Sequence, residues 1–353
     1  MSTHPLVSVV VVTYNSERDI ARCLESVGRQ TYSPLEVLVI DNDSGDRTEE
    51  IVRGYTTRVR IVRNSSNIGF AAAHNQGLRL SAGAHYLALN PDVEMTPGFV
   101  EELVKAMEID PRVGSVSGKL LRFATVNGAP LIDSTGIYMT PSIRHLDRGS
   151  GKPDRGQYDR LQYVFGASGA APLYRRRMLE AVSIDGECFD EDFFAYREDA
   201  DLAWRAQLLG WRALYTPHAV ARHERKVLPE RRRSLPDVIN MHSAKNRFLL
   251  RIKNQTPLEL VALLLPSLWR DLQVIGYVFL CERSSLPGLV FVARHFGRFC
   301  SKRRRIMSQR RITGWQMLRW FRRHPVAYDT KAGLAPERPA EKHRPARFLV
   351  EVI

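Results

Sequence analysis

Four stretches within residues 7–92 decide the fold: VSVVVVTYN (7–15), VLVIDNDSGDRT (37–48), NIGFAAAHNQGL (67–78) and YLALNPD (86–92). Short apolar runs in this region end in residues that carry carboxylate or amide groups, and helix-like segments separate them. In an open parallel sheet, the carboxyl ends of the strands form the ligand crevice. Asp41, Asp43 and Asp92 are therefore expected to converge on one site. This arrangement is typical of a protein that binds a nucleotide and a metal.

The alternation of strands and helices predicts an α/β fold with a doubly wound, mainly parallel sheet. Strands are expected over residues 7–12, 35–40, 59–62 and 86–89. Helices are expected from Ser16, which can cap the first one, over 48–55 and 69–80, and from Pro97 to Met107.

The pattern changes after about Val113, where short β-like pieces alternate with glycine and proline turns. A loop and a helix follow in GASGAAPLYRRRMLEAV (166–182), then an acidic cluster in FDEDFFAYREDADLAWR (189–205) and a strand-like Arg212–Tyr215. We expect one unit over residues 1–233, divided into a nucleotide-binding half (about 6–112) and a second half (about 113–233). A basic helical extension is expected over 234–327, and a disordered tail over 328–353.

The positive charge of the chain is concentrated near one end. Residues 283–323 contain twelve Lys and Arg and no Asp or Glu, whereas the first 220 residues are close to balanced. An anionic surface is therefore the expected partner of that end.

Cysteine use and hydropathy indicate the compartment. The cysteines form no CxxC pair, which argues against a zinc site or a disulfide framework and fits a reducing cytoplasm; they are Cys23, Cys188, Cys281 and Cys300. The N-terminus lacks the pattern of a signal peptide. Charges interrupt the most apolar segment, residues 258–281, so we expect it to lie on a surface and not to cross a membrane.

Aspartates follow two of the predicted strands. Asp41 and Asp43 can accept hydrogen bonds from a pyrimidine N–H or a ribose hydroxyl, although the same residue types also form ordinary turns. Asp92, in Asn90-Pro91-Asp92, can ligate a hard cation such as Mg²⁺, or it can simply cap the next helix.

The acidic cluster suggests a general base. Acids in a first helical turn are electrostatically favoured, and this explanation is preferred for Asp201. For Glu198 and Asp199, the crowding of like charges is expected to raise the pKa of a carboxyl and to favour proton abstraction from a hydroxyl. His223, or the competing His218, is a candidate metal ligand, although a lone histidine is more often structural.

In combination, these motifs resemble family 2 glycosyltransferases, and most closely the inverting, rhamnosyltransferase-like branch that assembles bacterial surface polysaccharides. The resemblance covers about residues 6–255. It implies a GT-A fold, a nucleotide-sugar donor and a divalent metal, Mg²⁺ or Mn²⁺.

The resemblance also assigns roles to matching positions. The donor nucleotide would be held by Thr13, Asn15, Asp41, Asp43, Asn67, Gly69, Asn75 and Asn90. The metal would be held by Asp92 and His223, and Asp199 would be the general base beside Glu198. The loop near donor sugar and acceptor would comprise Gly166, Ala167, Ser168 and Gly169. Asn90 replaces the first acid of the DxD metal motif, which removes one anionic oxygen near the metal.

The implied reaction is a direct displacement that inverts the anomeric carbon. Our preferred donor is dTDP-rhamnose, with UDP-galactofuranose, UDP-glucose and UDP-galactose as alternatives, and the acceptor is a lipid-linked glycan. A non-catalytic membrane-surface or polyanion-binding subunit is the alternative of another class. A nucleotidyltransferase is disfavoured because no glycine-rich phosphate loop follows the first strand.

Aromatic residues interleave with cations in the basic extension, over residues 258–279 and 298–323. This mixture suits an anionic membrane surface, so we expect a peripheral protein on the cytoplasmic face. The alternative is a helical subdomain that packs on the core or forms a homo-oligomer interface. Nucleic acid is disfavoured because the acidic clusters would repel its phosphates. Gln316–Trp320 matches the QxxRW string of processive family members, but its distant position indicates chance.

Overall fold

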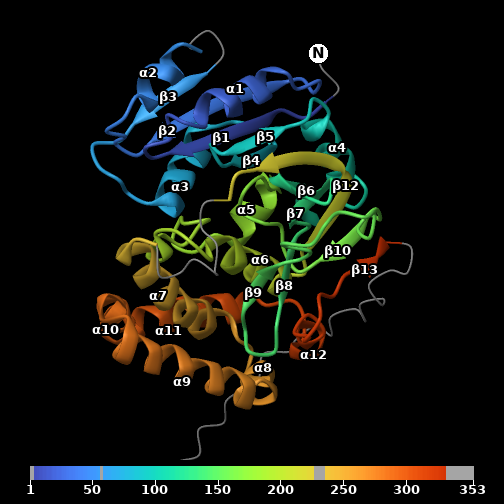
Figure 1. Ribbon diagram of the computed structural model, residues 1–353. Helices are drawn as coiled ribbons and strands as arrows, with labels where there is room; N and C mark the ends of the chain where they lie inside the picture. Colours follow the sequence, from blue (N-terminus) through green and yellow to red (C-terminus); the bar gives the residue numbers. More distant parts are fainter. Residues whose placement is uncertain (1–3, 56–58, 226–234, 331–353) are drawn as a thin grey trace, which may run out of the picture.

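The computed structural model describes residues 4–55, 59–225 and 235–330. Its central sheet has the strand order β13-β10-β12-β6-β11-β4-β1-β2-β3, with β5 added to β12 and β7 to β6. Helices cover both faces of this sheet, and a helical layer lies below it, at the bottom of Figure 1.

The first half of the sheet is parallel, as the sequence predicts. It consists of β1 (Val7–Thr13), β2 (Leu35–Asp41), β3 (Arg60–Arg63) and β4 (His85–Leu89). All seven residues of β1 are buried, because β1 lies between β2 and β4 with helices on both faces. Thr13 is in register with Asp41, so the β1 and β2 ends meet at one edge.

The helices of this half are α1 (Ile20–Gly28), α2 (Thr48–Arg53), α3 (Phe70–Leu80) and α4 (Phe99–Met107). All four were predicted, but two of them begin later than expected. Ser16 does not cap α1 with its side chain: its hydroxyl donates to the Tyr14 carbonyl, and its own carbonyl accepts from Ile20. α4 begins two residues after Pro97.

The second half of the sheet is mixed. It contains β5 (Val93–Met95), β6 (Val113–Val126), β7 (Ala129–Ser134), β10 (Gln162–Val164), β11 (Leu173–Arg175), β12 (Arg212–His223) and β13 (Tyr328–Asp329). β11 runs antiparallel between β4 and β6, whereas β6 and β12 are parallel. β12 is much longer than the predicted Arg212–Tyr215, because a bulge after Tyr215 lets it continue along β6. This length carries His223 to the carboxyl edge of β4.

Three short elements surround the acidic cluster and its neighbours. A hairpin of β8 (Ile137–Met139) and β9 (His145–Asp147) lies off the main sheet. α5 (Arg176–Val182) and the 3-10 turn η1 (Glu191–Phe193) lead to α6 (Glu198–Leu208).

The predicted C-terminal extension is helical. It comprises α7 (Asp237–Asn254), α8 (Pro257–Ala262), α9 (Leu264–Cys281), the 3-10 turn η3 (Arg283–Ser285), α10 (Leu286–Arg294), α11 (Phe296–Gln309) and α12 (Gly314–Leu318). It packs against the second half of the first unit, where α7 contacts α6 and η1, as the alternative to membrane association predicted. Tyr328–Asp329 of the predicted tail forms β13, and residues 331–353 lie outside the described residues.

The chain after α12 returns to the core. Trp320 and Phe321 are buried, and both rings contact Phe165. Phe321 also lies 5.1 Å from the ring of Trp204 on α6. Gln316 belongs to the capping box of α12. These packing and capping roles account for Gln316 and Trp320 without the QxxRW motif.

Candidate active site

Asp92 and His223 meet at the carboxyl edge of the sheet. Asp92 follows β4, and His223 is the last residue of β12, which pairs with β5 next to Asp92. The Oδ1 atom of Asp92 lies 3.3 Å from the Nε2 atom of His223. The structure therefore brings together the two residues that the resemblance assigns to the metal. The competing His218 is exposed on the same strand.

The other ring nitrogen of His223 faces a carboxylate that the sequence did not suggest. Its Nδ1 atom lies 2.7 Å from Asp133 Oδ2, at the end of β7, and Asp133 has no exposed surface. Burial alone lowers the pKa of His223, but the hydrogen bonds with Asp133 and Asp92 outweigh it and raise the pKa to about 9. A carboxylate on Nδ1 fixes the ring and leaves Nε2 for a ligand.

The groups at this edge fit a divalent ion that is shared with a substrate. Among the residues that the structure describes, no group of three or more His, Cys, Asp or Glu forms a complete metal site. Mg²⁺ is usually bound by one or two protein carboxylates, with phosphate and water completing its shell. The buried Oδ1 atom of Asn90 has no hydrogen-bond partner and supplies a further oxygen beside Asp92.

Asp199 lies at the N-terminus of α6 and is held by two backbone amides. Gly169 N donates to its Oδ2 atom at 2.9 Å, and Ala200 N donates to its Oδ1 atom at 2.7 Å. Burial, assisted by the negative charge of Asp147, nevertheless raises the pKa of Asp199 to about 6. The carboxylate is thus ionised at neutral pH but remains basic enough to take a proton.

Glu198 lies in a still less polar environment. Burial and the charge of Asp199 raise its pKa to about 8, and its Oε2 atom has no hydrogen-bond partner. At neutral pH Glu198 is therefore mainly protonated, and Asp199 is the ionised member of the pair. The sequence attributed these shifts to like-charge crowding, whereas burial is the larger cause for both residues.

The loop of Gly166, Ala167, Ser168 and Gly169 lies against this pair. A Cβ atom on Gly169 would lie 3.1 Å from Asp199 Oδ2, and one on Gly166 would collide with Ala203 on α6. Ala167 is buried. The Ser168 hydroxyl hydrogen-bonds to Asp147. The loop and the candidate base therefore form one packed unit.

Arg225 connects the two sides of the site. Its Nε atom lies 2.8 Å from Asp133 Oδ1, and its Nη2 atom lies 2.6 Å from Asp147 Oδ2. Asp133, Asp147 and Arg225 are the site residues that sequence reasoning missed. Arg225 follows the predicted His223 by two positions, and this closeness in sequence could have indicated it. Asp133 and Asp147 lie in the short strands β7 and β9, whose sequences show no pattern that marks a site.

The predicted nucleoside residues form the framework of two adjoining loops. Thr13 Oγ1 donates to Asp41 at 2.8 Å, and Ser44 donates to the same carboxylate through its hydroxyl and its backbone N–H. Asn15 Oδ1 accepts from Gly45 N at 2.8 Å. Asp41 is fully buried, whereas Asp43 is about half exposed and lies 3.2 Å from Arg63. Of these carboxylates, Asp43 is the one accessible to a ligand.

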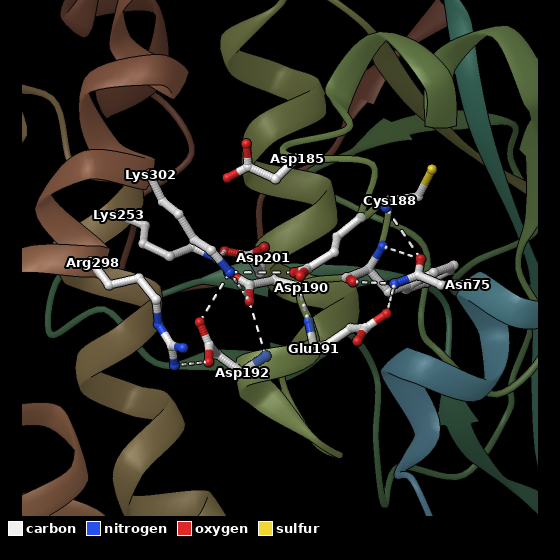
Figure 2. A network of polar contacts seen from close by, with 12 residues as sticks. Asn75, Asp185, Cys188, Asp190, Glu191, Asp192, Asp201, Lys253, Arg298 and Lys302 are labelled. Atoms are coloured by element: carbon white, nitrogen blue, oxygen red, sulfur yellow. Dashed lines mark hydrogen bonds and ion pairs between the residues drawn. The ribbon is translucent and has the colours of Figure 1, made fainter. Parts of the chain in front are cut away.

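The remaining predicted residues lie around the start of α3. Asn67 Oδ1 accepts from Gly69 N, and Gly69 adopts a positive φ of 88° that suits glycine. Asn75 is buried, and its amide bonds to Cys188, Phe189 and Glu191 (Figure 2). Both polar atoms of Asn75 bond within the chain, so its contacts join α3 to the acidic cluster.

Comparison with known proteins gives the family. The family described as glycosyl transferase family 2 matches residues 8–183, about half of the chain. The N-acetylglucosaminyl-diphospho-decaprenol L-rhamnosyltransferase of Mycobacterium tuberculosis is 27% identical over 249 residues, which cover 62% of this chain and 75% of that protein. Glycosyltransferase AglE of Haloferax volcanii is 42% identical over 111 residues, covering 30% of this chain and 36% of AglE.

Two solved structures share the fold. GalNAc-T7 with UDP, GalNAc and Mn²⁺ has a TM-score of 0.56 and 14% identity, covering 72% of this chain and 48% of that one. The mannosyltransferase PcManGT from Pyrobaculum calidifontis, with GDP-Man and Mn²⁺, has a TM-score of 0.50 and 18% identity, covering 87% and 86%. At these identities the likeness establishes the fold alone. The chain belongs to glycosyl transferase family 2 and is a glycosyltransferase with the GT-A fold.

Proposed function

We propose that this enzyme transfers a sugar from a nucleotide-sugar to a hydroxyl of a lipid-linked glycan, with inversion at the anomeric carbon. The observation that supports the proposal most directly is the environment of Asp199. This carboxylate is buried and ionised, and its pKa is raised. It lies beside the loop of residues 166–169, in the candidate site that also contains Asp92 and His223. L-Rhamnose from dTDP-rhamnose is the preferred donor sugar, because the mycobacterial relative is named as an L-rhamnosyltransferase acting on a diphospho-decaprenol substrate.

The proposed reaction is one displacement. The acceptor oxygen attacks the anomeric carbon as its proton passes to Asp199, and the bond to the donor diphosphate breaks with its electron pair on the leaving oxygen. Attack opposite to the leaving group inverts the anomeric centre. Glu198 stays protonated and does not compete for the proton.

Asp92 and His223 are the residues that would hold a divalent ion, Mg²⁺ or Mn²⁺, with Asn90 beside them. When bound, the ion supplies positive charge to the departing diphosphate. Asp133 orients His223 for this role through its bond to Nδ1. Arg225 in turn holds Asp133 and Asp147 in place.

For the nucleoside, we propose that Asp43 makes the direct contact, because it is the accessible carboxylate at the β2 edge. Thr13, Asn15 and Asp41 hold the loop that presents it. Asn67 and Gly69 shape the neighbouring turn, and we leave Asn75 out of the donor site because its amide is occupied by the chain.

UDP-galactofuranose, UDP-glucose and UDP-galactose remain alternative donors for the same site. A non-catalytic subunit is disfavoured because the acids that the chemistry needs, Asp92 and Asp199, are present and close to supporting groups. Nucleic acid is disfavoured for the same reason, since a buried acidic site repels phosphate backbones.

A donor panel tests the proposal. We expect dTDP-rhamnose to raise the Tm of the protein more than UDP-galactofuranose, UDP-glucose or GDP-mannose, and Mn²⁺ or Mg²⁺ to enlarge this shift. The measurement is thermal unfolding with each donor, with and without metal, against free nucleotide as control. Equal shifts with all four donors would contradict the choice of sugar, and no shift with any of them would contradict a preformed donor site.

We propose further that the enzyme works on the cytoplasmic face of the membrane, bound through α9. In this helix, large apolar side chains are exposed and polar side chains are buried, the reverse of an ordinary surface helix. Two of its three buried residues are polar: Asp271 accepts from Arg247 at 2.8 Å and pairs with Arg251, and Ser267 is buried, while the third is Val278. Most of its exposed residues are apolar. The large apolar side chains that are exposed on α8 and α9 are Leu260, Val261, Leu264, Leu265, Leu268, Trp269, Leu272, Phe279 and Leu280.

The position and charge of this surface favour an anionic bilayer as its occupant. α8 and α9 lie at the bottom of Figure 1, away from the parallel half of the sheet, which lies at the top. The same extension carries exposed arginines that can meet lipid phosphates, namely Arg283, Arg294, Arg304, Arg310 and Arg311. In the described part of the chain no single helix is long and apolar enough to span a membrane; a pair over Leu264–Cys281 and Arg283–Arg294 reaches that length and composition only with a bend of 116°.

Removing the most exposed apolar side chains tests this surface. We expect the triple variant Leu265→Ser, Trp269→Ser and Leu280→Ser to bind vesicles of phosphatidylglycerol and phosphatidylcholine at least about 100-fold more weakly, because three large apolar groups lose their burial in lipid. Flotation measures the binding, and the control is Ile109→Ser, an exposed residue just after α4. Unchanged binding by the triple variant, or a wild type that forms dimers through this face and ignores vesicles, would contradict the proposal.

A further inference from the structure

The segment that leads into the base helix has an unusual backbone. Phe194, Tyr196 and Arg197 have φ values of 64°, 69° and 72°, and none of them is glycine. Side chains disfavour this left-handed region, and such residues persist only where surrounding contacts hold them. The next two residues are Glu198 and Asp199. The orientation of the base therefore depends on whatever holds residues 193–197, which we call the base loop.

The contact that holds the base loop comes from the C-terminal extension. Asn246 on α7 is fully buried, and its Nδ2 atom donates to the carbonyl oxygens of Phe193, Ala195 and Tyr196 at 2.9, 2.8 and 2.7 Å. The two N–H hydrogens of one amide are thus shared among three carbonyls of the base loop. Without this amide, Phe193 O would keep its bond from Ala195 N, but the carbonyls of Ala195 and Tyr196 would lose this donor, and the left-handed conformation would lose its main support.

Neighbouring residues of α7 strengthen the same attachment. Lys245 Nζ donates to the Asp192 carbonyl at 2.6 Å, just before the base loop. His242, one turn earlier, stacks on the Phe194 ring with centroids 4.7 Å apart and planes at 10°. Each of these groups contacts the base loop or the residue before it, so α7 covers the loop along its length.

An ion-pair network fixes α7 and α11 on the acidic cluster (Figure 2). Lys253 pairs with Asp190 and lies 2.9 Å from Asp201 on α6, and Lys302 on α11 lies 2.7 Å from Asp190. Both lysines are buried. Asp201, expected from the sequence to be an ordinary acid of a first helical turn, is instead a buried partner of Lys253 and Arg205. These pairs set the distance between α7 and α6, which Asn246 needs in order to reach the loop.

The base loop also contacts the predicted donor side. Phe194 O accepts from Ala71 N at 3.1 Å, and a Cβ on Gly69 would lie 2.5 Å from the Phe194 ring. A shift of the loop would therefore move the start of α3 and the base together.

We propose that Asn246 is a positioning residue: by holding the left-handed base loop, it aims Asp199 at the acceptor hydroxyl. The C-terminal extension then forms part of the active site and is not only an appendage. The catalytic part of this inference rests on the proposed function, whereas its structural part, the holding of the loop, is independent of it. Asn246 itself touches no substrate.

The test compares two buried asparagines of the same helix. Asn254 is also fully buried on α7, but its Nδ2 atom donates to Asp201 and not to the base loop. We expect Asn246→Ala to lower kcat between about 10- and 100-fold, as displaced catalytic groups do, with a smaller change in the donor KM. Asn254→Ala is expected to lower the Tm comparably and to keep kcat near the wild-type value. Equal kcat values for the two variants would overturn the proposal.

Hydrogen exchange separates this inference from the proposed function, because it needs no substrate. In Asn246→Ala, the amides of residues 193–201 are expected to exchange about tenfold faster or more, the change that one unsatisfied buried group produces. In Asn254→Ala they are expected to stay protected. Unchanged exchange in Asn246→Ala would refute the holding role even if transfer by the wild type were absent. If Asn246→Ala does not fold, Lys245→Met provides the test, because it removes the bond to Asp192 and the cation–π contact with Phe291 but keeps Asn246. This variant must show the same faster exchange to a smaller degree, and wild-type exchange in it would contradict the account.

Discussion

Replacing Asp199 with asparagine is expected to lower the rate of sugar transfer about 1,000-fold, the usual contribution of a general base. Asparagine keeps the size of the side chain, and its one amide oxygen can still accept one of the two hydrogen bonds that Gly169 and Ala200 donate to Asp199. It cannot take a proton from the acceptor hydroxyl. The measurement is kcat with a lipid-linked acceptor, together with donor binding by calorimetry, which should be unchanged.

The pH profile gives the second signature of Asp199. Because a base must be deprotonated to act, kcat/KM of the wild type should rise with pH through a value near 6, well above the ordinary range of an aspartate, and fall away below it. This limb should be absent from the residual activity of Asp199→Asn. Glu102→Gln, on the surface of α4 beside Lys105, is the control and should match the wild type. Wild-type turnover by Asp199→Asn would remove Asp199 from the mechanism.

Replacing Asp92 with alanine is expected to lower transfer at least about 100-fold and to abolish the extra stabilisation that Mn²⁺ gives to the donor complex. Asp92 is the carboxylate that faces the Nε2 atom of His223, and Asn90 cannot replace its charge. Chelation of the wild-type enzyme with EDTA should reproduce the loss, and added Mn²⁺ should restore activity to the wild type only.

Two further variants sharpen this result. Glu94→Ala removes a partly exposed carboxylate two positions away, paired with Arg29, and should leave metal dependence unchanged. Asp133→Asn should weaken metal binding about 10- to 100-fold, because His223 loses the group that orients it. Full activity of Asp92→Ala in the presence of EDTA would show that the enzyme works without a metal at this position.

The parallel half of the fold was predictable because local pattern and global position agree there. A run of valines at 7–12 can hardly form anything but a buried strand, and the polar residues that follow must lie at the strand end. The second half was less readable, since β6 and β12 are long, bulged strands whose pairing depends on partners far away in sequence. Nothing local indicates that β12 continues past Tyr215 as far as His223.

The candidate site divides in the same way. Asp92, Asp199 and His223 were predicted from motifs, and the structure places Asp92 beside His223. Asp133, Asp147 and Arg225 were not predicted, because their contacts join distant elements. Asn75 lies in a strong motif that predicted a role in nucleotide binding, and in the structure its amide bonds to the acidic cluster.

The basic extension is the least local feature. Its composition suggested a surface for anions, but buried lysines of α7 and α11 neutralise acids within the protein, at Asp190 and Asp201. No sequence rule distinguishes a cation that meets lipid from one that pairs with an aspartate about 60 residues earlier or more. Ser267 and Asp271 of α9 are buried, so the large apolar side chains of this helix lie on its exposed face, which we propose as the membrane contact.

The most direct test of the central claim is the stereochemistry of the product. The enzyme, Mn²⁺ and dTDP-rhamnose are incubated with a diphospho-polyprenol-linked N-acetylglucosamine, and the anomeric configuration of the new linkage is read by NMR. The account predicts a glycosidic bond with the configuration opposite to that of the donor, formed by the wild type and not by Asp199→Asn. A product that retains the donor configuration would contradict the single displacement with Asp199 as its base.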